Sequence, residues 1–255
     1  MFNQQKQKLT AEIVKRKDLT DDLWILWLKP SQKFEFKPGQ YCTIGYGGTE
    51  RPYSIVSAPH EEYVELFFEL VPENLKTPQS LTPKLHTLKP GAVVEMRPRA
   101  KGTFLLDENF GIQAMVATVT GIAPFISMAR AYLNGYYAKK FEKPLYVFQG
   151  ASYLDEFGYD EELKTIAKTG KIVYVPTVSR VKEERNTGWQ GKTGRVNAII
   201  EDGFKKFGIT SKDSVVYLCG HQGMIDDLGN EKETSEKPLG KLLKAGFHVR
   251  SEIYF

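Results

Sequence analysis

The chain has 255 residues, 41% of them hydrophobic and 26% charged, which is enough for two ordinary domains with a globular composition. No apolar run approaches the ~20 residues that a membrane helix needs. The first eight residues are polar, so we expect a cytoplasmic protein without membrane contact. The net charge of +4 is too small to indicate a nucleic-acid partner. The two cysteines and four histidines lack metal-ligand spacing, so neither a metal nor an iron–sulfur cluster is expected.

Residues 1–108 are expected to form a first domain of short strands separated by turns. β-Branched and aromatic residues gather in short runs between turn signals such as Lys37-Pro38-Gly39 and Lys89-Pro90-Gly91. Thr82, followed by Pro83, is the candidate N-cap of a single helix. Strands at this spacing predict a small antiparallel barrel. The expected strands are 14–17, 23–28, 41–44, 64–71 and 93–97.

Residues 109–255 change to a different rhythm, in which apolar strands alternate with helices. Such a pattern predicts a parallel sheet with helices on both faces. The boundary between the two domains is expected within 108–113. Strands are expected at 114–118, 145–149, 172–176 and 215–219, and helices at 124–137, 159–168 and 194–206, with another beginning near 223.

Two short segments carry candidate chemistry. Thr118–Pro124 follows an expected strand, where the backbone N–H groups of a Gly-containing turn and the helix dipole can receive a phosphate. Arg51–Pro59 offers an arginine fork for phosphate, a flat tyrosine ring and a serine hydroxyl. Taken separately, each segment is equally well explained as structure: an ordinary strand-to-helix turn, and a barrel strand with a surface arginine.

Together, the two segments resemble the ferredoxin–NADP reductase superfamily, most closely its bacterial ferredoxin/flavodoxin–NADP reductases. The resemblance covers nearly the whole chain, because further matching segments follow in the family's order. These are Phe36-Lys37-Pro38-Gly39-Gln40-Tyr41, Ser80-Leu81-Thr82-Pro83-Lys84-Leu85, Gly102-Thr103-Phe104, Cys219-Gly220 with Met224, and the ending Glu252-Ile253-Tyr254-Phe255. It implies an FAD-binding antiparallel β-barrel domain and a Rossmann-like NADP-binding α/β domain whose C-terminal tail returns to the FAD.

The resemblance also implies roles at the FAD. Arg51 pairs with the FAD pyrophosphate, Tyr53 lies against the flavin ring, and Ser54 hydrogen-bonds near the reactive flavin nitrogen. Tyr254 or Phe255 stacks on FAD, and Glu252 helps to route a proton. The remaining FAD-binding positions are Pro52, Phe67, Phe68, Glu69, Leu70, Ser80, Leu81, Thr82 and Thr120.

For the nucleotide, the resemblance implies that Thr120 and Cys219 face the nicotinamide and that Arg180 and Arg195 hold the 2′-phosphate of NADP. The other implied contacts are Gly121, Ala151, Ser152, Ser179 and Gly220. Two departures leave the choice between NADP(H) and NAD(H) open. Val119 replaces the first glycine of the family's Thr-Gly-Thr-Gly, and Ser152 stands where NADP-preferring relatives often carry arginine. Arg185 and Lys192 are candidates for the missing charge.

The implied activity is that of a ferredoxin (or flavodoxin)–NADP(+) reductase, in which FAD exchanges electrons between NADP(H) and a separate acidic carrier protein. Ser54, Cys219 and Glu252 are its expected catalytic residues. Three alternatives stay open: an NAD(P)H-dependent reductase of free flavins or of an oxygenase, a non-catalytic electron-transfer or sensor subunit, and a nucleotide-binding module without flavin. A monomer is expected, because the sequence contains no evident association segment.

Overall fold

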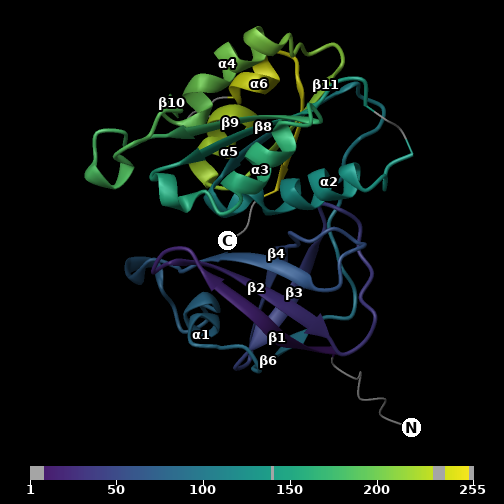
Figure 1. Cartoon of the computed structure of the whole chain (residues 1–255), viewed down its shortest axis with the longest axis vertical. Coiled ribbons are helices and arrows are strands. Elements are labelled where there is room, and N and C mark those ends of the chain that lie inside the picture. The colour runs from purple at the N-terminus through teal and green to yellow at the C-terminus, as the bar shows by residue number, and fades with distance from the viewer. Residues whose placement is uncertain (1–8, 139–140, 232–238, 253–255) are drawn as a thin grey trace. The chain divides into compact units, whose positions relative to one another are not determined.

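The computed structural model describes residues 9–138, 141–231 and 239–252. The chain divides into two compact units, Met1–Leu105 and Leu106–Phe255 (Figure 1). Within the described residues, each unit contains one six-stranded sheet and its own buried core. No helix in this part of the chain is long and apolar enough to cross a membrane.

The first unit is an antiparallel sheet of β1 (Leu9–Asp18), β2 (Leu23–Pro30), β3 (Tyr41–Tyr46), β4 (Thr49–Ser54), β5 (Val64–Glu69) and β6 (Val93–Met96). Its strand order is β4-β3-β6-β1-β2-β5. The two outer strands meet beyond the end of β4, where Ile55 bridges Leu66 and the N–H of Val56 donates to the carbonyl of Glu65 at 2.9 Å. The sheet therefore curls almost into a closed barrel.

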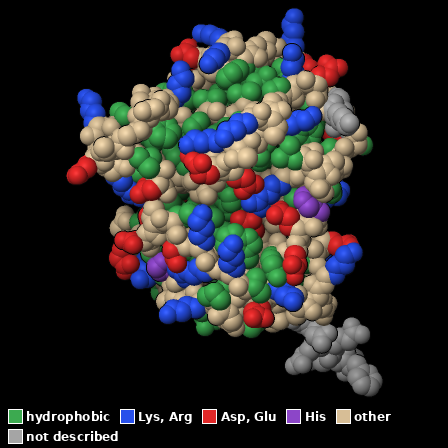
Figure 2. Space-filling model, viewed as in Figure 1, with side chains coloured by type: hydrophobic (Ala, Val, Ile, Leu, Met, Phe, Trp, Pro, Cys, Tyr) green, Lys and Arg blue, Asp and Glu red, His purple; other side chains and the backbone are tan. Residues whose placement is uncertain are grey.

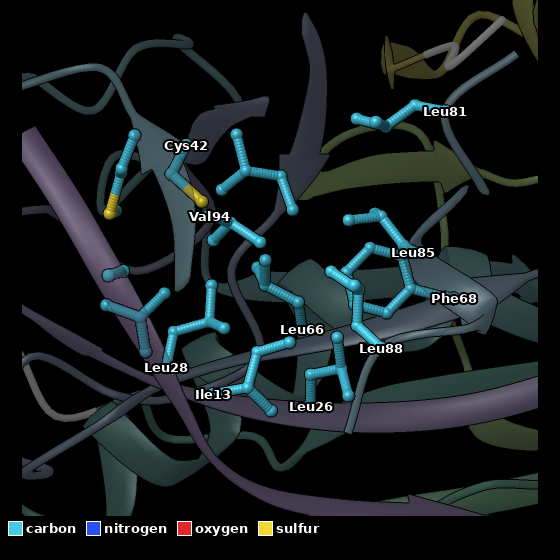
Figure 3. Packing of buried hydrophobic residues seen from close by; sticks show 14 of the residues in the cluster. Ile13, Leu26, Leu28, Cys42, Leu66, Phe68, Leu81, Leu85, Leu88 and Val94 are labelled. Atoms are coloured by element: carbon cyan, nitrogen blue, oxygen red, sulfur yellow. The ribbon is translucent and has the colours of Figure 1, made fainter. Parts of the chain in front are cut away.

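The core of this unit is formed by the inner faces of the strands. Along β1, buried Leu9, Ala11 and Ile13 alternate with more exposed residues, the period expected of a strand with one buried face. A register shift between Ile13 and Lys15 interrupts the pairing of β1 with β2, and such bulges bend a strand. Figure 3 shows the side chains that meet in this core: Leu26, Leu28, Cys42, Leu66, Phe68 and Val94 join Ile13.

A short helix, α1 (Thr82–His86), packs against the same core. Leu81, Leu85 and Leu88 are all buried in it (Figure 3). Arg16 of β1 fixes the end of this segment, because its guanidinium donates to the carbonyls of His86 at 2.6 Å and Leu88 at 2.8 Å. The position of the helix is thus set by the barrel.

The expectation that Thr82 caps this helix is wrong. The cap position is Leu81, no side chain caps the helix there, and Thr82 is the first helical residue. The Thr82 hydroxyl oxygen instead accepts a 3.1 Å hydrogen bond from the N–H of Val71. The Thr82 hydroxyl, which the local sequence suggested as a helix cap, therefore makes a tertiary contact instead. Pro83 lies in the first turn, as expected.

The second unit is a parallel sheet with the order β10-β9-β8-β7-β11-β12. The expected fold class, an antiparallel barrel followed by a parallel-sheet α/β domain, is confirmed. The strands are β7 (Ile112–Thr118), β8 (Leu145–Ala151), β9 (Ile172–Val178), β10 (Lys192–Thr193), β11 (Ser214–Cys219) and β12 (His248–Glu252). The helices are α2 (Ala123–Leu133), α3 (Asp160–Ala167), α4 (Val196–Phe207), α5 (Gln222–Gly229) and α6 (Lys241–Lys244).

Helices cover both faces of this sheet. Buried side chains of α4, α5 and α6 pack with Ala114, Val116, Phe148, Val216 and Leu218 on one face. The helices α2 and α3 lie across the sheet from α4 (Figure 1). Since all of these helices connect parallel strands, the carboxyl ends of the strands meet at a single edge.

Several element ends differ from the sequence-based expectation for local reasons. The helix expected to reach residue 137 ends at Leu133, because Gly135 adopts a left-handed φ of +74°. The helix expected from residue 194 begins at Val196, because Gly194 has φ of +109° and Arg195 is extended. Strands β10 and β12 and helix α6 were not predicted at all.

Candidate functional site

In the first unit, Ser54 ends β4 with a buried hydroxyl. Among the described residues, this hydroxyl has no hydrogen-bond partner. An unsatisfied buried polar group destabilises a protein by about 1–3 kcal/mol. The bridge between Ile55 and Leu66 holds the serine beside β5. The hydroxyl is therefore suited to a hydrogen bond with a bound molecule.

Tyr53 precedes this serine, and its ring is held by other aromatic side chains. Its ring centroid lies 4.7 Å from that of Phe68, which in turn stacks on Trp24 at 5.3 Å. Burial raises the pKa of the Tyr53 hydroxyl well above its ordinary value. The ring is therefore uncharged at neutral pH, and its orientation is set by Phe68.

Arg51, two residues earlier on β4, reaches the turn that precedes Ser80. Its guanidinium donates to the carbonyl of Glu50 at 2.8 Å and to that of Gln79 at 3.1 Å. The Ser80 hydroxyl oxygen accepts a 2.9 Å bond from the N–H of Thr77, which closes the turn. The structure therefore brings together Arg51 and the Ser80–Thr82 segment, which are far apart in the sequence.

Lys84 is a cation near Arg51 that sequence analysis did not single out. Its ammonium donates to the Thr49 hydroxyl at 2.9 Å and to the carbonyl of Gly47 at 3.1 Å. Thr49 and Arg51 lie on the same face of β4, because alternate residues of a strand point the same way. Lys84 and Arg51 therefore place two positive charges on this face. The sequence feature that could have identified Lys84 is its position in the first turn of the predicted helix.

The other residues predicted around this site vary in exposure. Phe67 and Phe68 of β5 are buried, whereas Glu69 is exposed. Leu70 is half-buried, and its N–H donates to the carbonyl of Asp22 at 2.7 Å. Pro52 is exposed. The predicted stacking residues Tyr254 and Phe255 lie outside the described residues.

In the second unit, the order of the strands reverses between β7 and β11. From β7 the chain proceeds outward through β8 and β9 to β10, and it then returns to add β11 on the other side. Ligands of open parallel sheets bind outside the carboxyl ends of the strands at such a point. Thr118 ends β7, Cys219 ends β11, and the N–H of His221 donates to the Thr118 hydroxyl at 2.7 Å.

The turns after β7 and β11 touch through two glycines. A Cβ on Gly121 would lie 2.1 Å from the carbonyl oxygen of Cys219. A Cβ on Gly220, whose φ is +132°, would lie 2.2 Å from the Thr118 hydroxyl and 2.9 Å from its backbone nitrogen. Neither position has room for a side chain. The structure thus brings the predicted residues Thr120, Gly121, Cys219 and Gly220 to one strand edge.

Val119 stands in this turn in a conformation that favours glycine. It is the non-glycine residue with positive φ, +41°, in the described part of the chain. For a β-branched residue, such a conformation is strained by roughly 1–3 kcal/mol. Its side chain packs, as does that of Trp189, against a small apolar cluster of Ala151, Phe157 and Val178. This packing joins the turn to the loops after β8 and β9.

Cys219 is completely buried and pairs in register with Glu252 of β12. Burial, with a smaller effect of the Glu252 carboxylate, raises the pKa of the Cys219 thiol well above its ordinary value. The thiol is therefore neutral and can act as a small apolar group or a weak donor, not as a thiolate. Glu252, the last described residue, is half-buried.

The loops after β8 and β9 are tied together by buried Asn186. Its side-chain nitrogen donates to the carbonyls of Ser152 and Arg180, both at 2.9 Å, and its oxygen accepts from the N–H of Leu154 at 2.8 Å. A carboxylate oxygen of Glu156 accepts from the N–H of Ser152 at 2.8 Å. Sequence analysis missed both residues, because these bonds depend on tertiary placement.

Near these loops lie the arginines predicted to bind phosphate. Arg180 donates to the Tyr153 hydroxyl at 2.8 Å and lies 3.7 Å from the carboxylate of Glu183. Arg195 is exposed and precedes α4. The N–H of Ser179 donates to the carbonyl of Ala151 at 2.9 Å. Ser152, Ser179, Arg180 and Arg195 therefore all lie near the carboxyl ends of β8 and β9.

Comparisons with known proteins find relatives that span both units of the chain. The oxidoreductase NAD-binding domain family matches residues 115–229. A flavodoxin/ferredoxin–NADP reductase of Escherichia coli strain K12 is 29% identical over 231 residues, covering 86% of this chain and 87% of that protein. A probable flavin reductase of Vibrio harveyi is 28% identical over 223 residues, covering 86% and 89%.

Solved structures share the fold across almost the whole chain. The crystal structure of a ferredoxin NADP+ reductase from Neisseria gonorrhoeae with bound FAD and NADP has a TM-score of 0.74 at 20% identity, and covers 98% of this chain and 100% of that one. A ferredoxin reductase in carbazole 1,9a-dioxygenase also has a TM-score of 0.74, at 22% identity, covering 98% and 70%. At these identities, the likeness establishes the common architecture.

Proposed function

Because this chain is an oxidoreductase of the ferredoxin–NADP reductase superfamily, we propose that it binds FAD and exchanges electrons between a nicotinamide dinucleotide and a separate one-electron carrier protein. The observation that carries the proposal is the buried, unpartnered hydroxyl of Ser54, on the strand that also holds Arg51 and Tyr53. These three residues supply a donor, a cation and an aromatic ring, the groups that a flavin nucleotide requires.

The first unit would hold the FAD. Arg51, with Lys84 on the same strand face, would neutralise the pyrophosphate, and Tyr53 would lie against the flavin ring. The Ser54 hydroxyl would hydrogen-bond near the reactive flavin nitrogen. The remaining contacts would come from Pro52, Phe67, Phe68, Glu69, Leu70, Ser80, Leu81, Thr82 and, from the second unit, Thr120; Tyr254 or Phe255 would stack on the FAD.

The second unit would hold the nicotinamide dinucleotide. The edge of β7 and β11 suits it, because the strand order reverses there and the closely packed Gly121 and Gly220 turns carry no side chains at that point. Thr120 and Cys219 would face the nicotinamide. The adenosine end would lie over the loops after β8 and β9, near Ala151, Ser152, Ser179, Arg180 and Arg195.

The bound FAD would supply the redox chemistry, because a flavin can accept a hydride and release its electrons one at a time. The chain's own residues orient the reaction. The neutral, buried thiol of Cys219 presents little bulk and no charge to the nicotinamide. The Ser54 hydroxyl offers a hydrogen bond, and the Glu252 carboxyl, beside Cys219 in the sheet, can hold or move a proton.

The proposed partner is a ferredoxin or flavodoxin. Both cysteines, Cys42 and Cys219, are buried, and they are too few to hold a four-cysteine cluster within this chain. A separate carrier would therefore receive the electrons. On the face shown in Figure 2, basic and acidic side chains are mixed, so the net charge of +4 is not gathered there.

A second candidate function is an NAD(P)H-dependent reductase of free flavin. It is favoured by the names of curated relatives, since the Vibrio harveyi protein and others of similar identity are called flavin reductases. The two functions differ in how the flavin is held. A carrier-protein reductase keeps its FAD through turnover, whereas a flavin reductase binds and releases flavin as a substrate.

The deciding experiment measures electron delivery by the full chain after loading with FAD and removal of unbound flavin. With NADPH or NADH as donor, kcat/KM is compared for a ferredoxin, a flavodoxin and free FMN. Retained FAD and carrier reduction at a kcat/KM at least ~10-fold above that for FMN would support the proposal. Loss of FAD during gel filtration, with turnover only on added flavin, would favour the second candidate.

A further inference from the structure

We propose that Asp155 and Glu183 make the nucleotide site selective for NADH over NADPH. This inference rests on the proposed function and adds the nucleotide preference, which the sequence leaves open. Its basis is an arrangement of charges around Tyr153: both arginines near this ring are already engaged by carboxylates. A 2′-phosphate would therefore meet partnered cations and nearby anions.

The first of these arginines is Arg180. Its guanidinium donates to the Tyr153 hydroxyl at 2.8 Å and lies 3.7 Å from a Glu183 carboxylate oxygen. The same Tyr153 hydroxyl donates to the other oxygen of Glu183. Tyr153, Arg180 and Glu183 thus form a closed set of contacts. A 2′-phosphate could pair with Arg180 only by entering the field of the Glu183 carboxylate.

Arg185, the cation that could replace the family's missing arginine at Ser152, is engaged in the same way. Its Nε donates to a carboxylate oxygen of Asp155 at 2.8 Å. Its guanidinium lies over the Tyr153 ring, 4.2 Å from the centroid. One face of the ring is therefore covered, and the arginine already has a carboxylate partner.

The backbone beneath this cluster is firmly tied, which limits rearrangement. Asn186 bonds to the carbonyls of Ser152 and Arg180 and to the N–H of Leu154. Glu156 accepts from the N–H groups of Ser152 and Tyr153 at 2.8 and 3.1 Å. Only side-chain rotations could free the two arginines.

The local charge balance also disfavours a phosphate. Residues 152–156 and 180–186 contain four carboxylates (Asp155, Glu156, Glu183, Glu184) and three cations (Arg180, Lys182, Arg185), a sum of −1. All of these residues lie on the two loops that Asn186 joins. Arg195, near the same strand ends, brings this sum to zero, so a dianionic 2′-phosphate finds no excess of positive charge, whereas a free 2′-hydroxyl can donate to a carboxylate.

Arg195 is the remaining arginine predicted for the phosphate. It is exposed at the start of α4, and the N–H of the preceding Gly194 donates to the carbonyl of Val178 at 2.8 Å. Arg195 therefore lies near the end of β9. As a single cation, it provides less than the pair of arginines that a dianion favours.

The test compares the full wild-type chain with D155N/E183Q, which keeps the side-chain shapes and removes both charges. E184Q is the matched control, because Glu184 is an exposed carboxylate in the same loop. Steady-state kcat/KM is measured for NADH and NADPH with the FAD-loaded proteins and a small one-electron acceptor. Independently, calorimetry measures binding of AMP and of adenosine 2′,5′-bisphosphate to each protein.

We expect wild-type kcat/KM to favour NADH by at least ~10-fold. In D155N/E183Q the ratio of kcat/KM for NADH to that for NADPH should fall at least ~5-fold, because the KM for NADPH becomes lower. E184Q should change the same ratio by less than ~2-fold. The affinity for the bisphosphate should rise in the double variant relative to that for AMP. A wild-type preference for NADPH would overturn the inference. So would an equal change, in E184Q and in D155N/E183Q, of the ratio of kcat/KM for NADH to that for NADPH.

These outcomes are separable from failure of the proposed function. If neither nucleotide reduces the bound flavin, the reductase proposal fails, whereas the calorimetric comparison of AMP with the bisphosphate still tests the carboxylates. If both nucleotides work and NADPH is preferred, the reductase proposal stands and the role of Asp155 and Glu183 is rejected.

Discussion

The N–H of His221 donates a 2.7 Å hydrogen bond to the hydroxyl of Thr118, and this bond joins the ends of β11 and β7. It lies where the strand order of the second sheet reverses, between two turns that touch through Gly121 and Gly220. The Thr118 hydroxyl therefore adds a side-chain bond to the backbone pairing of β7 with β11 at the proposed nicotinamide site.

Replacing Thr118 with valine should loosen this edge. The variant keeps the side-chain shape but removes the acceptor, so we expect a loss of about 1 kcal/mol of unfolding free energy. The KM for the nucleotide should rise several-fold, because the turn after β11 is no longer bonded to the end of β7. T118S retains the hydroxyl and serves as the control; a similar KM in T118V and T118S would contradict this role.

Replacing Ser54 with alanine should affect stability and activity in opposite directions. Without its unpartnered hydroxyl, the FAD-free chain should gain about 1 kcal/mol of stability, a rise in Tm of about 2–4 °C for a chain of this size. Flavin reduction by the nucleotide, followed by stopped-flow absorbance, should slow by roughly 10-fold.

The control for this variant is S57A. The Ser57 hydroxyl oxygen accepts a 3.1 Å bond from the N–H of Glu65, so its removal should lower Tm. If S54A also lowered the Tm of the FAD-free chain, the Ser54 hydroxyl would have a partner in the folded protein, and its proposed role at the flavin would lose its main support.

The two thiols should be unreactive in the native chain. Burial raises the pKa of Cys42 to about 12 and that of Cys219 well above its ordinary value. At pH 8, a disulfide reagent should therefore modify neither thiol within minutes, and should modify both after unfolding in guanidinium chloride. Rapid modification of native Cys219 would contradict its assignment as a neutral, buried group beside the nicotinamide.

The same pKa shifts predict how stability depends on pH. A thiol whose pKa is higher in the folded than in the unfolded chain binds its proton more tightly when folded. Its contribution is fully present below the ordinary thiol pKa of about 8.5 and is lost as pH rises above it. Denaturant titrations should show stability falling above pH 9, with a shallower fall in C42A and C219A.

Replacing Asn186 with aspartate should separate the loops after β8 and β9. The change removes the side-chain donor to the carbonyls of Ser152 and Arg180, so we expect a loss of about 1–3 kcal/mol of unfolding free energy. The nucleotide KM should rise while FAD retention stays unchanged, since the loops lie in the second unit. T187A, an exposed neighbour, is the control; equal KM values in both variants would reject this positioning role.

Much of the architecture could be predicted from the sequence because local patterns agree with it. Apolar runs such as those of β7 and β8 are buried on both faces, and the helices between them follow turn signals. Strand β12 escaped prediction because its sequence His248–Glu252 is short and polar. It is recognised as a strand only through its pairing with β11.

The candidate residues could be named from motifs, whereas their contacts could not. Arg180 and Arg185 were visible as cations, yet their carboxylate partners Glu183 and Asp155 depend on how two loops fold back on each other. The same holds for Asn186, which the sequence shows only as one polar residue in a charged stretch. Pairing across distant segments is the information that a single sequence lacks.

The bond between His221 and Thr118 joins residues 103 positions apart, with four strands of the same sheet between them in the chain. Such long-range pairing is slow to form, because a large loop must close first. During synthesis, β7 can pair with β8 well before β11 has left the ribosome. Until then, one side of β7 is an unpaired apolar edge exposed to aggregation. Nucleotide binding is therefore expected only after β11 has been made and has paired with β7.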